Sequence, residues 1–226
     1  METKLFKSAI CRVNNIFRPY PTLFYFPGIK SQQVWDSNLI PTAKLLEKNS
    51  NTIAKEIINL DNFENDYKLI DKEKSLHEGS WDWASYMSKG KVSPKFKEKF
   101  PNTYEILNSL DDLMFDVPFS YCFFSRLAPK SKIKPHYGPC NLRLRIHLGL
   151  DIPDNCFMKI TDIKHNWEDY KTIVFDDTYI HEVENNNENK YRTLLLLDIW
   201  HPEIKKEERE AIRNMFKGAS SKGWIS

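Results

Sequence analysis

The sequence has few cysteines and few glycines, and it lacks the marks of an exported or membrane-spanning chain. Four cysteines and seven glycines occur among 226 residues, and no two cysteines have the CxxC spacing of redox or zinc motifs. No apolar run approaches the roughly 18 residues of a membrane helix. Near the N-terminus, Lys4, Lys7 and Arg12 interrupt every short hydrophobic stretch, which predicts no signal peptide. Dispersed cysteines without an export signal favour free thiols and a cytoplasmic location.

Neither sign of charge dominates the chain. Its 33 lysines and arginines against 31 acids leave a net charge of +2, without the concentrated basic excess of a nucleic-acid-binding protein. The lysine run in residues 89–99 is interpreted as a solvated face. An apolar fraction of 41% is typical of a globular protein, and 226 residues fit one domain. The expected partner is therefore a protein, a peptide or a small molecule.

Residues 1–117 are expected to form a mostly helical or irregular support region. Apolar residues recur near helical spacing in residues 31–60, and Pro41 is expected to break this helix into two pieces. Residues 61–101 are polar and irregular, whereas residues 103–114 have the pattern of an amphipathic helix.

Residues 118–203 have the periodicity of strands, and a charged helix and tail are expected in residues 204–226. Short strands separated by turn residues predict a sandwich or a barrel. A polar interior face selects an antiparallel jelly roll of the cupin kind, that is, a double-stranded β-helix. The expected strands cover residues 120–125, 132–136, 142–150, 156–160, 171–175, 178–184 and 192–199.

One of these strands has a basic face. Because side chains alternate across a strand, Arg143, Arg145 and His147 share one face and the intervening leucines and isoleucine share the other. A buried arginine is costly without a partner, so this face favours a pocket for an anionic ligand. The alternative is a structural network in which Arg143 or Arg145 pairs with Asp176, Asp177 or Asp198, and it suits Arg143 better than Arg145.

Two histidines, His136 and His181, flank the basic strand in the sequence. Neutral imidazole binds Fe(II), zinc and copper, and non-haem iron oxygenases combine two histidines with one carboxylate. The usual spacing would place that carboxylate at position 138, where the chain has Gly138. Spacing alone is therefore weak evidence for a metal, and two core histidines are the alternative. A structural zinc site would need further ligands that the cysteine spacing does not offer.

Several segments then occur in a fixed order. They are Phe124-Ser125, Pro135–Pro139, Asn141–Leu150, Phe175–Asp177, His181–Val183, Arg192 and Asp198–Pro202. In this order they resemble the aspartyl/asparaginyl β-hydroxylases, a family of Fe(II)- and 2-oxoglutarate-dependent oxygenases. The resemblance is specific over residues 118–203 and weaker upstream, at residues 26–28 and 79–81. Members of the family also have a glycine where the third, carboxylate ligand would stand.

The resemblance implies a role for each matched polar residue. His136 and His181 would bind Fe(II). Arg145 and His147 would hold the keto acid end of 2-oxoglutarate, while Arg192 with Ser125 would bind its distal carboxylate. The implied reaction uses O2 to convert 2-oxoglutarate to succinate and carbon dioxide and to hydroxylate an unactivated C–H bond.

The resemblance further implies a substrate, the β-carbon of Asp or Asn residues in a protein or peptide. Arg143 and Trp81 are the candidate substrate contacts, although Trp81 is equally a packing anchor. The protein-hydroxylating relatives have basic side chains near the positions of His77 and Phe123, and this chain lacks them. Hydroxylation of a small molecule or a lipid acyl chain is therefore an alternative. A non-catalytic cupin that binds a ligand is another, although it would be expected to have lost His136, His181 or Arg192.

Overall fold

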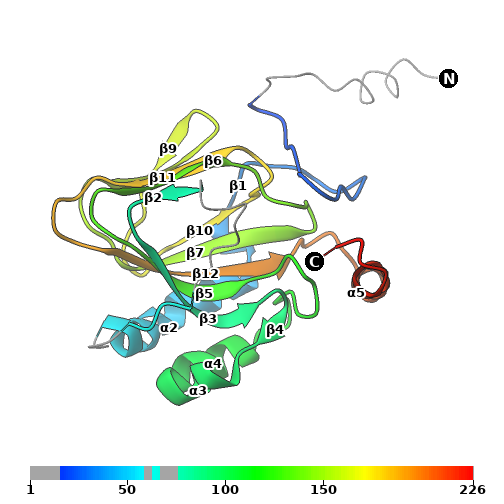
Figure 1. Cartoon of the computed structure of the whole chain (residues 1–226), viewed down its shortest axis with the longest axis horizontal. Helices are drawn as coiled ribbons and strands as arrows, with labels where there is room; N and C mark the ends of the chain where they lie inside the picture. The colour runs from blue at the N-terminus through cyan, green and yellow to red at the C-terminus, as the bar shows by residue number, and fades with distance from the viewer. Residues whose placement is uncertain (1–15, 59–62, 67–75, 226) are drawn as a thin grey trace.

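Two antiparallel sheets dominate the computed structural model, which describes residues 16–58, 63–66 and 76–225 (Figure 1). One sheet has seven strands in the order β1-β10-β7-β12-β5-β3-β4, and the other has five in the order β2-β6-β11-β8-β9. The strands are β1 Val34–Trp35, β2 His77–Glu78, β3 Trp81–Ser88, β4 Lys91–Val92, β5 Cys122–Leu127, β6 Ser131–His136, β7 Arg143–Asp151, β8 Cys156–Ile160, β9 Ile163–His165, β10 Thr172–Phe175, β11 His181–Asn185 and β12 Arg192–Trp200.

Apart from the β8–β9 hairpin, which stays in the five-stranded sheet, successive strands from β5 onward switch from one sheet to the other. β5, β7, β10 and β12 belong to the seven-stranded sheet, whereas β6, β8 and β11 belong to the five-stranded one. This alternation is the winding of a double-stranded β-helix, with helices added to a mainly β core. The predicted fold class is confirmed.

The central strand β12 shows how the core is divided. All nine of its residues are buried. Leu194 and Leu196 pack between the two sheets, whereas Leu195, Leu197 and Ile199 pack on the opposite face, toward the helices. Because side chains alternate, the polar residues at positions 192 and 198 also face the space between the sheets. The predicted faces of the basic strand β7 follow the same rule, since its leucines and isoleucine all pack in the helix-side cluster.

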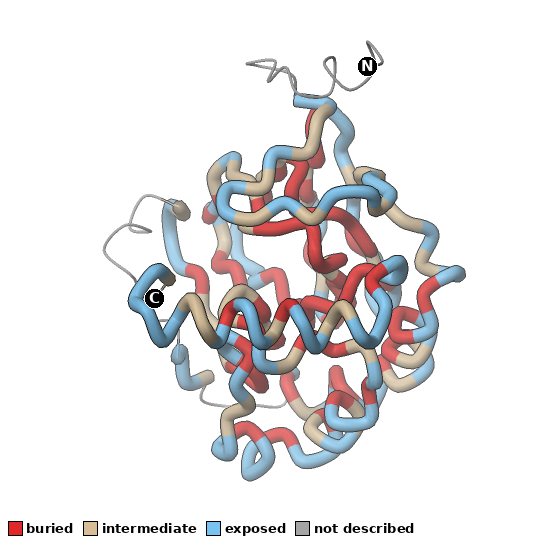
Figure 2. The backbone as a smooth tube through the Cα atoms, turned by 90° about the vertical axis from the view of Figure 1, so that its right-hand side faces the viewer, coloured by how far each residue is buried: buried red, intermediate tan, exposed pale blue. Residues whose placement is uncertain are grey.

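The helices cover one outer face and one end of the sheets. α2 (Pro41–Ile58), α3 (Pro94–Lys99) and α4 (Pro101–Asn108) lie against the seven-stranded sheet (Figure 1). The short 3-10 helix η1 (Ser37–Leu39) precedes α2. α5 (Lys206–Ser221) lies at one end, with one side packed on the protein and the other exposed (Figure 2). Within the described residues, no helix is both long and apolar enough to cross a membrane.

The support region differs from its prediction in three places. Pro41 begins α2 rather than breaking a helix, because its fixed φ and missing N–H suit a first helical position. Residues 81–88 form the eight-residue strand β3, although they have no clear local periodicity. Their pairing with β5 decides the extended conformation. The helix expected at 103–114 spans Pro101–Asn108 instead. Parts of the 61–101 segment lie outside the described residues.

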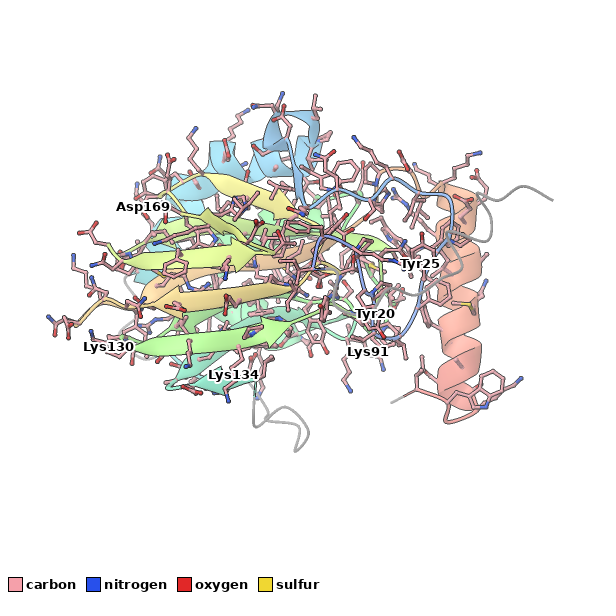
Figure 3. All side chains as sticks on the ribbon, turned by 90° about the horizontal axis from the view of Figure 1, so that it is seen from above. Tyr20, Tyr25, Lys91, Lys130, Lys134 and Asp169 are labelled. Carbon is pink, nitrogen blue, oxygen red and sulfur yellow. The ribbon has the colours of Figure 1, made fainter. Side chains whose placement is uncertain are left out.

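An extended segment, residues 20–26, lies along the two loops that contain the ends of β6 and β11. The N–H of Tyr20 donates to Thr178 O at 2.7 Å, and the N–H of Thr22 donates to Gly138 O at 3.1 Å. Figure 3 shows this segment between the strands and α5, with Tyr20 and Tyr25 labelled. One N-terminal segment therefore joins two loops that are about 40 residues apart in the sequence.

Candidate active site

Two histidines meet where the five-stranded sheet reaches the pocket. His136 is the last residue of β6 and His181 the first of β11, and the two are paired across the strands with ring centroids 4.0 Å apart. Each Nδ1 lies against a backbone carbonyl, Lys134 O at 2.8 Å and Tyr179 O at 2.9 Å. A carbonyl only accepts, so each Nδ1 carries the proton and each Nε2 keeps a lone pair. Burial lowers the pKa of both rings, which keeps them neutral.

A carboxylate lies close to position 138 although position 138 itself is glycine. A Cβ on Gly138 would fall 2.4 Å from the carboxyl group of Asp177, and the N–H of Gly138 donates to Asp177 O at 2.6 Å. Only glycine therefore fits beside Asp177. Among the described residues, no group of three His, Cys, Asp or Glu side chains is arranged to hold a metal. The site offers two neutral imidazoles as protein donors, and Gly138 leaves no side chain to act as a third.

Arg143 and Arg145 are paired with two buried aspartates. Arg143 Nη2 lies 2.5 Å from Asp177 Oδ2, its Nη1 lies 3.0 Å from Asp198 Oδ2, and Nη1 also donates to Phe119 O. Arg145 donates to Asp198 Oδ1 from Nε at 2.8 Å and lies 3.4 Å from Asp177 Oδ2. Burial opposes the charged form of Asp177, but the two guanidiniums hold its pKa well below its ordinary value. Two cations and two carboxylates thus cancel.

The structural network was expected to suit Arg143 better than Arg145, but Arg145 also has an acidic partner. Asp198 lies directly opposite Arg145 on the neighbouring strand, in a β12–β7 pair. This partner is 53 residues away in the sequence. The structural network proposed as an alternative for Arg143 therefore includes both arginines. With its guanidinium occupied and its side chain 2% exposed, Arg143 is a poor contact for a substrate.

Arg192 is a buried arginine of the opposite kind. Its side chain is 1% exposed, and no ion pair reaches it within the described residues. Its Nη2 donates to Ser125 Oγ at 3.0 Å, while Nε has no partner there. Trp81 Nε1 donates to the same oxygen at 2.8 Å, so the hydroxyl hydrogen of Ser125 remains for another acceptor. Burial lowers the pKa of Arg192 to about 10, and the group is still a cation at neutral pH.

His147 lies between the histidine pair and Arg192. Neither ring nitrogen of His147 has a partner among the described residues, although the side chain is 4% exposed. Its ring packs 5.0 Å from Phe175, which itself lies 5.5 Å from His181. On the other side, Trp167 lies 5.9 Å from His147 and 5.2 Å from the guanidinium of Arg192. Burial, and then the charge of Arg192, lowers the pKa of His147.

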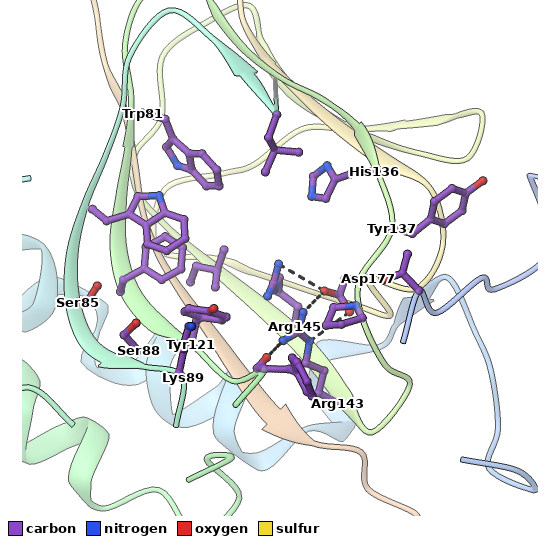
Figure 4. Close-up of a pocket in the computed structure, with 18 of the residues that line it drawn as sticks. Trp81, Ser85, Ser88, Lys89, Tyr121, His136, Tyr137, Arg143, Arg145 and Asp177 are labelled. Carbon is purple, nitrogen blue, oxygen red and sulfur yellow. Dashed lines mark hydrogen bonds and ion pairs between the residues drawn. The ribbon is translucent and has the colours of Figure 1, made fainter. Parts of the chain in front are cut away.

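An open pocket of about 1080 Å³ reaches His136 and Arg145, whereas Ser125, His147 and Arg192 are not among the described residues that line it (Figure 4). His136, Gly138, Arg145 and Asp177 line one part of it, and Trp81 faces His136 across the opening. The remaining lining residues are mostly aromatic side chains, serines and lysines from β3, β4, β5 and the adjoining loops.

The predicted site residues converge from both sheets. The five-stranded sheet supplies the histidine pair, and the seven-stranded sheet supplies the others, Trp81, Ser125, Arg143, Arg145, His147 and Arg192. Trp81 both packs on Trp83 and lines the pocket, so its two interpretations are compatible. Sequence reasoning missed Trp167, which lies between β9 and β10 where no periodicity marks it. It also missed how close Asp177 is to Gly138. The signal that could have shown this is the position of Asp177, four residues before His181 in the sequence.

Comparison with known proteins identifies the family. A model of the family described as aspartyl/asparaginyl beta-hydroxylase matches residues 47–202. Aspartate beta-hydroxylase domain-containing protein 2 of Xenopus tropicalis is 32% identical over 206 residues, which is 87% of this chain and 52% of that protein. The human aspartyl/asparaginyl beta-hydroxylase is 27% identical over 195 residues, covering 84% of this chain and 26% of that protein.

Among solved structures, a Pseudomonas putida prolyl-4-hydroxylase covers 70% of this chain and 88% of its own, at 12% identity and a TM-score of 0.38. So distant a likeness bears on neither substrate nor mechanism. The chain spans about half the length of the domain-containing relatives it matches. Since the family model covers more than half of the chain, the protein belongs to the aspartyl/asparaginyl β-hydroxylase family.

Proposed function

We propose that this protein is an Fe(II)- and 2-oxoglutarate-dependent hydroxylase that uses O2 to hydroxylate an unactivated C–H bond. One observation carries the proposal: Arg192, a buried cation with no carboxylate partner among the described residues, lies beyond a pair of neutral histidines whose Nε2 atoms keep a lone pair. A buried unpaired charge is costly, so a bound anion is the expected partner. Membership of the hydroxylase family supports the same conclusion.

The residues present fit an iron ion held by two protein ligands. His136 and His181 would supply imidazole nitrogen, which suits Fe(II). The carbonyls of Lys134 and Tyr179 accept hydrogen bonds from the Nδ1 protons and orient the rings, as backbone carbonyls do for the histidine ligands of many metal sites. A two-ligand set leaves positions for small molecules. When bound, the metal would supply the oxygen chemistry, which no protein side chain here supplies.

The residues beyond the histidines fit a dicarboxylate. Arg192 and the free hydroxyl hydrogen of Ser125 would bind the distal carboxylate, and Trp81 fixes the Ser125 oxygen. His147, with both ring nitrogens free, would donate or accept near the keto acid end. Arg145 would act there through its positive charge rather than through Nε, because Nε already donates a hydrogen bond to Asp198. The surrounding rings of Phe175 and Trp167 exclude water and strengthen these polar contacts.

Three other functions are weaker. A non-catalytic cupin would have no need for the combination of His136, His181 and Arg192, all of which are present. A structural zinc site would need ligands that the described residues do not group. Hydroxylation of Asp or Asn in a protein or peptide follows from the family name and competes with a small-molecule or lipid acyl substrate.

The test is metal-dependent formation of succinate from 2-oxoglutarate. Protein loaded anaerobically with Fe(II) is expected to form succinate slowly on exposure to O2 even without substrate. His136→Ala and His181→Ala should each abolish this turnover. His201→Ala is the matched control, because that histidine is buried against Trp35, away from the pair. If no succinate forms and calorimetry detects no metal-dependent binding of 2-oxoglutarate, the proposal fails and the ligand-binding cupin replaces it.

A further inference from the structure

An aromatic wall lines the pocket between the histidine pair and the protein surface. We define it as Trp81, Trp83, Tyr121 and Phe123, from strand β3 and from the start of β5. Trp83 stacks on Phe123 with centroids 3.9 Å apart and meets Trp81 edge-on at 4.9 Å. Leu196 extends the wall inward. Such a surface gains free energy by covering apolar groups, not by solvating a charge.

The two arginines beside His136 already have counter-charges. Arg143 and Arg145 share Asp177 and Asp198 between them. Lys134 also lines the pocket, and its Nζ lies 3.3 Å from Glu78, a carboxylate that it shares with Lys132 at 3.0 Å. An acidic side chain presented to the histidine pair would therefore enter an apolar wall without a free cation, which costs free energy. The target carbon is better presented on an apolar segment.

Two lysines at the outer end of the pocket have no such partner. Lys89 and Lys91 line the pocket, are exposed and make no ion pair within the described ranges. They flank the β3–β4 turn, where Lys89 and Gly90 both have positive φ. Gly90 donates to Ser120 O at 2.9 Å and accepts from the N–H of Asp116 at 3.0 Å, so the turn is anchored to the protein. The lysines are thus held at the mouth of the pocket rather than on a free loop.

The carboxylate of Asp66 also lines the pocket and sets one negative charge against the two positive charges of Lys89 and Lys91. The carboxylate of Asp66 accepts from the N–H of Ser85 at 2.8 Å and from its hydroxyl at 2.9 Å. Figure 4 shows Lys89, Ser85 and Ser88 at the end of the pocket opposite His136, with Tyr121 between. The pocket therefore has an apolar middle and a positive mouth.

We propose that this pocket binds a substrate with an apolar segment and an anionic group at its far end. The apolar segment would lie along the aromatic wall and place its carbon at the histidine pair, while Lys89 and Lys91 bind the anionic group. This substrate class rests on the proposed hydroxylase activity. A carboxylate and a phosphate ester share the required chemistry. Neither an acidic peptide nor a neutral apolar molecule satisfies both ends.

The test is binding of matched ten-carbon probes, followed through the fluorescence of the wall tryptophans. Decanoate and decyl phosphate are expected to bind at least tenfold more tightly than decanol, and the stronger of the two identifies the anionic group. Affinity should rise about fourfold with each added methylene from hexanoate to decanoate, the gain for a buried CH₂. The double variant Lys89→Glu/Lys91→Glu should weaken anion binding at least tenfold. Lys44→Glu/Lys48→Glu, on exposed positions of α2, is the charge-matched control.

Each contrary result has a definite meaning. Equal binding of decanol and decanoate, or no effect of the lysine reversal, would overturn the anionic group. An affinity independent of chain length would overturn the apolar segment. Stimulation of succinate formation by an aspartyl peptide, with no binding of decanoate, would replace this substrate class with the peptide. Because probe binding needs neither iron nor O2, loss of succinate formation with intact probe binding would reject the hydroxylase and leave the pocket assignment standing.

Discussion

Two groups of buried arginines lie on neighbouring strands of one sheet, and they differ in their counter-charges. Arg143 and Arg145 pair with Asp177 and Asp198, whereas Arg192 contacts Ser125 and the face of Trp167 and has no acidic partner in the part of the chain that the structure describes. The first arrangement is complete without a ligand. The second is incomplete, since a buried cation without an anion is costly. The difference separates a structural network from the proposed anion site, although all three residues are arginines inside the same fold.

The largest effect is expected from breaking the complete network. Asp198→Asn removes one of two carboxylates, and it should leave a buried positive charge uncompensated at a cost of about 3–5 kcal/mol in the free energy of unfolding. Urea denaturation measures this loss. Asp154→Asn, at an exposed position, should change stability by less than about 0.5 kcal/mol. A loss below about 1 kcal/mol for Asp198→Asn would show that the carboxylate of Asp198 is not needed to compensate the arginine charges.

Removing Arg192 should impair ligand binding strongly and the stability of the fold little or not at all. Arg192→Met is expected to weaken 2-oxoglutarate binding a hundredfold or more, while the free energy of unfolding without ligand stays the same or rises, because an uncompensated charge is replaced by an apolar group. Titration calorimetry and urea denaturation together test it. Arg126→Met, at the half-buried position after Ser125 in β5, is the matched control. If Arg192→Met destabilised the fold as much as Asp198→Asn, Arg192 would have a structural role rather than a role in ligand binding.

Two adjacent aspartates extend the comparison to pH. Asp177 has cationic partners that lower its pKa, so its contribution to stability is present above the ordinary pKa near 3.8 and is lost as pH falls. Asp176 has hydrogen bonds but no ion pair within the described residues, and burial raises its pKa to about 6. The folded state therefore holds the proton of Asp176 more tightly than the unfolded state does. The contribution of Asp176 to the free energy of unfolding is fully present below about pH 4 and is lost as pH rises through about 6.

In the unchanged protein, this titration should lower the free energy of unfolding by about 2–3 kcal/mol between pH 4 and pH 6, since each pKa unit corresponds to about 1.4 kcal/mol. The Asp176→Asn variant is expected not to show this decrease. Urea denaturation of both proteins at several pH values in this range measures the difference, and other titrating groups cancel. Parallel stability curves for the two proteins would contradict the raised pKa.

The smallest expected effect concerns the N-terminal segment that joins the two histidine loops. Thr22→Pro removes the N–H that donates to Gly138 O, and loss of one such hydrogen bond should weaken metal binding about fivefold. Competition between Co(II) binding and a chelator measures the affinity. Tyr25→Pro is the matched control, because within the described residues its N–H donates to neither loop. Equal affinities for the two variants would remove the segment from the support of the metal site.

Much of the fold was predictable because strand periodicity is local. The alternation in Asn141–Leu150 placed Arg143, Arg145 and His147 on one face, and that face lines the space between the sheets. From β5 to β12 the strand bounds agree with the expected ranges to within a few residues, except that β9, Ile163–His165, was not expected. β3 was missed because its sequence alternates poorly, and pairing with β5 decides its conformation. Pro41 was misjudged because a proline can either break a helix or begin one.

The sequence by itself determined which residues are available for chemistry: the histidines, the basic strand and the late arginine in their fixed order. Only the tertiary structure decided which arginine is free. Asp198 reaches Arg145 across 53 residues, because β12 and β7 are neighbours in the sheet, and the same arrangement leaves Arg192 without an acid. Alternation along a strand follows from local backbone geometry, whereas charge pairing depends on which distant strands become neighbours.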